Sequence, residues 1–323
     1  MNLQTIDNKT GTVEGFALVK SCDKKNAKNG TVYLDIVLAD KESELVAKLW
    51  DFKDGVQREV EANTIVKVRG LPGEYNGTPQ LKIERIRPIS PTDEVEMSDF
   101  VPSAEYTGEY MLANIQKTAE NFKNEELKRL VAAFLDKYKE GILDCPAAFR
   151  LHHAVRGGLL YHTLSMIKLA EAVIALYPSV DGDLLLAGVI LHDILKTKEF
   201  NIAKTGLVDS YSLDGFLIGH LVMGAMEVKK LGEELEISAD TLRLAEHMII
   251  SHHGVPEFGA AVRPLFLEAE ILSQIDLMDA RIYEIEKAVE DVKPGEFSTK
   301  QWALEDRRFL NHGRKPVKTV ANL

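Results

Sequence analysis

The chain has 323 residues, of which 45% are hydrophobic and 28% charged, and this ordinary globular composition excludes a disordered or fibrous protein. Its length predicts two domains, each large enough to bury its own core. The formal net charge of −11 argues against a polyanionic partner for the chain as a whole. Residues 1–90, however, hold 14 Lys and Arg against 13 Asp and Glu, so any affinity for nucleic acid should lie in that segment or at bound cations.

The sequence also predicts where the protein resides. The first residues have no basic region followed by an apolar run, which argues against a signal peptide. No uninterrupted apolar stretch approaches the roughly 20 residues that a membrane span needs. Cys22 and Cys145 lie far apart and do not form a disulfide framework. We therefore expect a cytoplasmic protein with no membrane partner.

Residues 11–87 alternate between apolar and polar with a period of two, which is typical of strands with one buried face. The expected strands cover residues 11–20, 31–40, 44–50, 64–70 and 79–86. Residues 54–61, between the third and fourth strands, are compatible with a short helix. This order predicts that residues 1–90 form a five-stranded OB-fold β-barrel, a small fold that often binds single-stranded nucleic acid.

The same alternation places Tyr33, Lys48 and Trp50 on the outside of the barrel. Two aromatic rings and an ammonium group there could stack on bases and contact a phosphate. Alternatively, Trp50 covers one end of the barrel and Lys48 is merely solvated. OB-folds also bind proteins, so the fold alone does not identify a nucleic-acid site.

After a linker rich in proline and acidic residues, at 91–109, the periodicity becomes helical, and residues 110–292 are predicted to form an all-α domain. In the C-terminal tail, residues 293–323, we expect Phe297 and Trp302 to pack against the domain. The expected helices cover residues 110–121, 125–139, 159–177, 183–195, 213–231, 240–251 and 265–292.

Eight of the nine histidines fall between His152 and His253, and the first 151 residues contain none. A single histidine in apolar sequence is more often a hydrogen-bonded core residue than a ligand. Several of them together with aspartates predict a metal centre, because imidazole and carboxylate groups ligate divalent transition metals. The pattern therefore predicts a metal-dependent hydrolase. Its members, in chain order, are His162, His192, Asp193, His220, His252 and Asp276.

This ordered pattern resembles the HD phosphohydrolase superfamily in its two-metal form. An OB-fold followed by the segments GGLLYHTLSM, LHDILK, GHLVMG, SHHG and IDLMDA resembles the YhaM-type 3′–5′ exoribonuclease family over nearly the whole chain. The resemblance implies two metal ions that share Asp193 as a bridging ligand. The first ion would be held by His162, His192, Asp193 and Asp276, and the second by Asp193, His220 and His252.

Mixed nitrogen and oxygen ligands favour Mn²⁺, Fe, Co, Ni or Zn over Mg²⁺, and the family resemblance points to Mn²⁺. Two ions roughly 3.5–4 Å apart would activate a water molecule and stabilise the attacking and leaving oxygens. Lys196 and Arg156 are candidates to contact the substrate phosphate. His253 is either a phosphate contact or the ligand in place of its neighbour, and Asp279 competes with Asp276 for the ligand role. His152 and His153 either orient substrate or are structural.

We therefore expect a 3′–5′ exoribonuclease that converts single-stranded RNA, and potentially single-stranded DNA, to nucleoside 5′-monophosphates. The alternative is an HD phosphodiesterase of nucleotides or cyclic dinucleotides with the barrel as an accessory. A third hypothesis, from a non-enzymatic class of protein, is a single-strand-binding or scaffold protein with a degenerate HD site. Asp193→Ala is expected to abolish hydrolysis and to leave the fold intact. Self-association into a homo-oligomer stays open.

Overall fold

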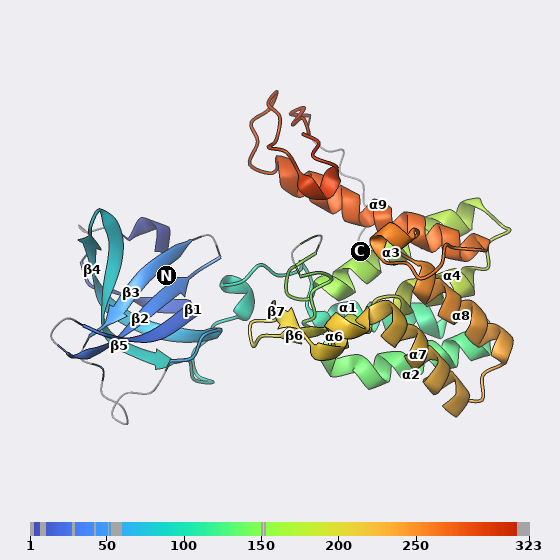
Figure 1. Ribbon diagram of the computed structural model, residues 1–323, viewed down its shortest axis with the longest axis horizontal. Helices are drawn as coiled ribbons and strands as arrows, with labels where there is room; N and C mark the ends of the chain where they lie inside the picture. The colour runs from blue at the N-terminus through green and yellow to red at the C-terminus, as the bar shows by residue number, and fades with distance from the viewer. Residues whose placement is uncertain are drawn as a thin grey trace. The chain divides into compact units, whose positions relative to one another are not determined.

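The computed structural model describes residues 3–6, 11–27, 30–41, 43–50, 52, 60–149, 151 and 153–314. It divides into two compact units, of which the first contains the residues up to Ser103 and the second contains most of the remainder (Figure 1). The division falls inside the segment for which the sequence predicts a linker.

The first unit is a closed barrel of strands β1 (Val13–Asn26), β2 (Val32–Ala39), β3 (Glu44–Leu49), β4 (Thr64–Tyr75) and β5 (Thr78–Pro88). The strands follow one another around the barrel in the order β1-β2-β3-β5-β4, with β1 antiparallel to β4 and β3 parallel to β5. This is the OB-fold that the sequence predicts. Alternate residues fill the interior, and Ile36, Leu38, Ala47 and Leu81 are completely buried. Most of the short helix expected at 54–61 lies outside the described residues.

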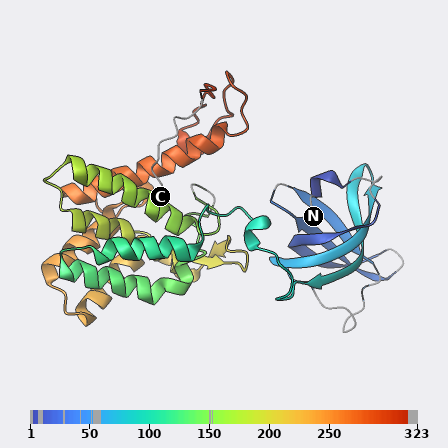
Figure 2. The same cartoon turned by 180° about the vertical axis from the view of Figure 1, so that it is seen from behind.

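The second unit is helical, as predicted, and α1 and α2 lie side by side in it (Figure 2). Its core is apolar, and Phe134, Ile142, Met166 and Leu185 are completely buried. The helices are α1 (Gly108–Glu120), α2 (Glu125–Ile142), α3 (Gly158–Leu176), α4 (Gly182–Leu191), α5 (Lys196–Glu199), α6 (Leu213–Leu217), α7 (Gly219–Glu234), α8 (Ala239–Ser251) and α9 (Leu267–Val289). Short 3₁₀ turns cover Leu3–Thr5, Met97–Asp99, Pro256–Phe258 and Trp302–Leu304.

Two predicted helices are interrupted. The helix expected at 183–195 ends at Leu191 and is followed by the separate turn α5. The helix expected at 213–231 breaks between α6 and α7, where Gly219 has a φ of +77°, a left-handed conformation that interrupts the helix and that glycine adopts without strain. The sequence also does not reveal a small hairpin between α5 and α6, formed by β6 (Phe200–Ile202) and β7 (Val208–Tyr211).

Helix α3 is apolar enough to cross a membrane by length and composition, with 19 residues and a hydropathy of 1.4. The helix does not contradict the expectation drawn from the sequence, because Lys168 and Glu171 interrupt its apolar run. The helix packs against α1, α4 and α9, and Leu159, Leu164 and Met166 are buried in the core. Its apolar character reflects that packing.

The expectation that Phe297 and Trp302 pack against the domain is wrong, because the two residues are 61% and 74% exposed. The segment is held by polar contacts instead. Buried Ser298 donates its backbone N–H to the carbonyl oxygen of Phe309, and its Oγ accepts the backbone N–H of Phe309 at 3.0 Å.

Candidate metal centre and barrel surface

Five separate segments of the helical unit bring the predicted ligands together. His162 lies in the second turn of α3, the His192-Asp193 pair follows the end of α4, and His220 is in the first turn of α7. His252 follows α8, and Asp276 lies midway along α9. The four histidine side chains and Asp193 are buried, whereas the side chain of Asp276 is 16% exposed. The arrangement is thus a buried cluster with one partly open carboxylate.

Asp193 lies in the middle of this cluster. Its Oδ2 is 3.2 Å from Nε2 of His192, whereas its Oδ1 is 3.3 Å from Nε2 of His220 and 3.6 Å from Nε2 of His252. The two carboxylate oxygens therefore face different histidines. On the His192 side, ligand atoms of His162, His192 and Asp193 lie within 4.8 Å of one another.

The tautomers of two histidines follow from local helix geometry. Nδ1 of His192 donates to the carbonyl oxygen of Val189 at 2.8 Å, and Nδ1 of His252 donates to that of Ile249 at 2.7 Å. A carbonyl oxygen can only accept, so the proton must be on Nδ1 and the lone pair on Nε2. Each acceptor lies three residues earlier in the same helix. A backbone carbonyl oxygen at the end of its own helix therefore orients each of these two rings, with Nε2 toward Asp193.

The other two histidines are oriented by carboxylates. Nδ1 of His162 donates to Oδ2 of Asp279 at 2.7 Å, and its Nε2 lies 3.2 Å from Oδ1 of Asp276. Nδ1 of His220 donates to Oε2 of Glu199 at 2.9 Å. Histidines that ligate metals in proteins commonly donate their other ring N–H to a carboxylate or carbonyl in this way.

Four buried atoms of the cluster have no hydrogen-bond partner among the described residues: Nε2 of His192, His220 and His252, and Oδ1 of Asp193. Buried polar atoms without partners are costly, so such a concentration needs an explanation. Three imidazole nitrogens and a carboxylate oxygen form a donor set that suits a divalent cation such as Zn²⁺, Mn²⁺ or Fe²⁺. The residues present thus fit a metal centre.

Electrostatics in the cluster favour ligating forms for two of these groups. Burial would raise the pKa of Asp193, but His192 and Lys196 hold that pKa well below its usual range. Burial lowers the pKa of His220, which keeps its ring neutral. For His162, burial opposes the charged form, but hydrogen bonds with Asp276 and Asp279 outweigh it and raise the pKa to about 9.

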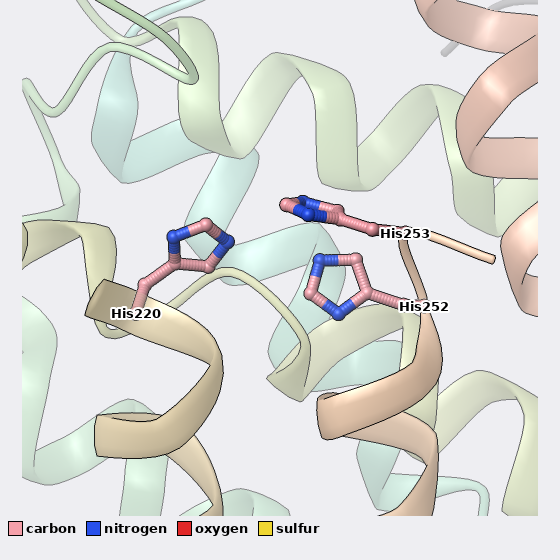
Figure 3. A group of neighbouring side chains, drawn as sticks. All are labelled: His220, His252 and His253. Atoms are coloured by element: carbon pink, nitrogen blue, oxygen red, sulfur yellow. The ribbon is translucent and has the colours of Figure 1, made fainter. Parts of the chain in front are cut away.

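Two further predicted site residues, Lys196 and His253, contact or lie beside the ligand cluster. Lys196 is buried and its Nζ donates to Oδ2 of Asp193 at 2.6 Å. The His253 ring lies beside His220 and His252, with ligand atoms of all three within 4.8 Å of one another (Figure 3). Burial lowers the pKa of His253 to about 3, and its Nδ1 donates to the carbonyl oxygen of Phe258 at 2.8 Å.

Arg156 contacts a carboxylate that is not among the predicted ligands. Its Nη2 donates to Asp144 at 2.8 Å, and the side chain passes close over Gly206 in the β6–β7 turn. Asp144 therefore engages its guanidinium group.

Asp279 lies behind His162, on the side opposite to Asp276. It accepts hydrogen bonds from Nδ1 of His162, from Nε2 of His153 at 2.9 Å and from Oγ of Ser165. This surrounding favours an orienting role for Asp279, and it shows His153 in contact with the carboxylate. His152 lies outside the described residues.

Sequence reasoning missed Glu199 and Ser165. Neither belongs to a pattern that could have revealed it. Glu199 ends the four-residue helix α5 and reaches His220 only because the fold brings α5 against α7.

The barrel carries a separate cluster on its outer face. The rings of Tyr33 and Trp50 stack with centroids 4.6 Å apart, and Nζ of Lys48 lies 5.1 and 5.7 Å from those two centroids. Tyr75, at the end of β4, adds a ring 5.9 Å from the same ammonium group and is 65% exposed. The sequence prediction did not include Tyr75, because its partners lie on other strands. We call these four residues the aromatic surface of the barrel.

Comparison with known proteins gives one match within the helical unit and several over nearly the whole chain. A family model described as the HD domain matches residues 159–281, which include every candidate ligand from His162 to Asp276. A protein from Listeria innocua named 3′–5′ exoribonuclease YhaM is 43% identical over 313 residues, which cover 96% of this chain and 99% of that protein. The protein of the same name from Bacillus subtilis is 40% identical over 298 residues, which cover 92% of this chain and 94% of that protein. Similarity of this extent shows that the chain belongs to the YhaM family of 3′–5′ exoribonucleases.

Proposed function

We propose that the protein degrades single-stranded RNA from its 3′ end, releasing nucleoside 5′-monophosphates at a centre of two divalent metal ions, with Mn²⁺ as the native metal. The observation that carries this proposal is the geometry of Asp193, whose Oδ1 faces His220 and His252 while its Oδ2 faces His192. A carboxylate whose two oxygens are directed at different imidazoles is suited to bridge two ions.

In this proposal His162, His192 and Asp276 complete the first position, and His220 and His252 complete the second. Ions bound there would supply Lewis-acid stabilisation of the phosphate oxygens and an activated water. The protein's own contribution is orientation, because each of the four rings is fixed through its Nδ1. Mixed nitrogen and oxygen ligands support Mn²⁺ over Mg²⁺.

We assign RNA binding to the aromatic surface of the barrel. Stacking of bases on Tyr33, Trp50 and Tyr75 would contribute about 1–3 kcal/mol per base without selecting a sequence. The ammonium group of Lys48, which lies over all three rings, would contact the phosphate backbone. Nothing in this arrangement selects for a 2′-hydroxyl, so short single-stranded DNA is expected to bind as well.

Lys196 and His253 border the ligand cluster, and they are the residues that we propose to contact the substrate phosphate. Arg156 is a weaker candidate, because Asp144 already pairs with its guanidinium group. A pocket that accepts a free 3′ end should close about one nucleotide beyond the scissile phosphate.

The proposal is tested with RNA labelled at its 5′ end, incubated with Mn²⁺ or with EDTA, and with a circular RNA of the same sequence. We expect stepwise shortening from the 3′ end in Mn²⁺, none in EDTA, and no cutting of the circle. Nucleoside 5′-monophosphates should accumulate. Internal cuts in the circle would show an endonuclease, and hydrolysis of cyclic dinucleotides without any shortening of RNA would show a phosphodiesterase of small molecules.

A further inference from the structure

Helix α7 begins without a cap from its own neighbouring residues. Ile218, which precedes it, makes no side-chain capping hydrogen bond. Instead, Oε1 of Glu199 accepts the backbone N–H of His220 at 3.3 Å, while Oε2 of the same carboxylate accepts Nδ1–H of His220 at 2.9 Å. One buried carboxylate therefore holds both the backbone and the ring of His220.

Glu199 is itself fixed by the backbone around it. Its carbonyl oxygen accepts the N–H of Ser212 at 2.8 Å, which ties α5 to the start of α6. A Cβ at Gly215 would lie 2.3 Å from that oxygen, so only glycine permits this approach of α6. The negative charge of Glu199 also lies at the N-terminus of a 16-residue helix, where the helix dipole favours it.

The role of Glu199 differs from that of the other orienting groups. His192 and His252 are held by carbonyl oxygens of their own helices, so their orientation comes with the helix. His220 is in the first turn of α7 and takes its acceptor from another element. Asp279, which orients His162, also accepts from two further side chains, whereas both hydrogen bonds described for the Glu199 carboxylate come from His220.

We propose that Glu199 is a positioning residue for the metal position formed by His220 and His252. It keeps the proton of His220 on Nδ1 and aims Nε2 at Oδ1 of Asp193, 3.3 Å away. This inference rests on the proposed metal centre. Loss of such an outer partner typically lowers metal affinity by 10–100-fold.

The test is a titration of the metal-free, full-length protein with Mn²⁺, followed by electron paramagnetic resonance of the free ion. Wild type should bind two ions. Glu199→Ala should bind one ion with wild-type affinity and the other about 10–100-fold more weakly. The weaker Mn²⁺ affinity of Glu199→Gln should lie between those of wild type and Glu199→Ala, because an amide oxygen accepts only one of the two N–H groups well.

Two control variants separate positioning from general stability. Ser238→Ala removes the N-cap of α8, the helix that leads to His252, so it should lower Tm while both Mn²⁺ affinities stay unchanged. Glu268→Gln changes another buried carboxylate, which accepts the backbone N–H of Asp181 at the start of α4, and it should also leave both affinities unchanged.

Wild-type Mn²⁺ affinities in Glu199→Ala would overturn the inference, as would an equal loss of affinity in Ser238→Ala. If Glu199→Ala does not fold, Glu199→Gln decides the question, because an unchanged second affinity there overturns the inference too. Failure of the wild type to bind any Mn²⁺ would instead count against the proposed metal centre.

Discussion

The buried ion pair between Lys196 and Asp193 makes Asp193→Ala a test of stability as well as of hydrolysis. The Lys196 ammonium is 2.6 Å from Oδ2 of Asp193, and the residue is only 7% exposed. Removing one partner of a buried pair costs about 3–5 kcal/mol. The lysine could release its proton at pH 7 instead, which limits the cost to about 5 kcal/mol for a group whose usual pKa is 10.5. The expectation from the sequence, that this substitution leaves the fold intact, is therefore revised.

We expect Asp193→Ala, in the metal-free state, to lose about 3–5 kcal/mol of unfolding free energy, which is a fall in Tm of roughly 6–20 °C for a domain of this size. The double variant Asp193→Ala/Lys196→Met should recover most of that loss, because it leaves no unpaired charge in the core. Neither variant should hydrolyse RNA.

Urea unfolding and thermal unfolding in EDTA, followed by circular dichroism at the helical wavelength, measure both effects. A single variant as stable as wild type would refute the reasoning, and so would a double variant no more stable than the single one. In either case the Lys196 ammonium would not depend on Asp193 for its burial.

Other predictions concern the barrel and the 3′ end. Trp50→Ala should weaken binding of single-stranded RNA by about 1–3 kcal/mol in fluorescence anisotropy. Tyr177→Ala, at an exposed tyrosine of the helical unit, should not weaken it, and equal RNA affinities of the two variants would exclude stacking on Trp50. Deletion of residues 1–103 should leave hydrolysis of an activated phosphodiester intact and lower kcat/KM on long RNA, and an unchanged kcat/KM would remove the barrel from substrate capture. RNA with a 3′-phosphate, which adds roughly −1.5 to −2 charge, should be cut more slowly than RNA with a 3′-hydroxyl; matched time courses with equal rates would argue against recognition of the end.

The fold could be predicted from the sequence wherever the burial of a residue depends on its position in a local repeat of apolar residues. In residues 31–50 the apolar positions of the alternation, such as Ile36, Leu38 and Ala47, are buried inside the barrel, as expected for strands with one buried face. The period of helices predicted the all-α unit, but not the break at Gly219, because a left-handed glycine does not change the spacing of the apolar residues around it.

The candidate site could be predicted only as far as its ordered ligand pattern. Asp276 and Asp279 lie on the same side of α9, so spacing alone does not separate them. The structure does, because His162 stands between them with Nε2 toward Asp276 and Nδ1 toward Asp279. The contacts of Glu199 and Tyr75 depend on elements distant in the chain, and no local pattern encodes them.

The members of the cluster extend along the chain from α3 to α9, and this order has a consequence during protein synthesis. The barrel, with Tyr33 and Trp50 on its surface, is complete before the first ligand helix is made. Asp276 lies in the last long helix, so a nascent or truncated chain that ends before it has no complete centre. Under the proposed function, such a chain can bind RNA but cannot cut it. Under the same proposal, no nuclease activity is expected during translation until the helical unit is finished.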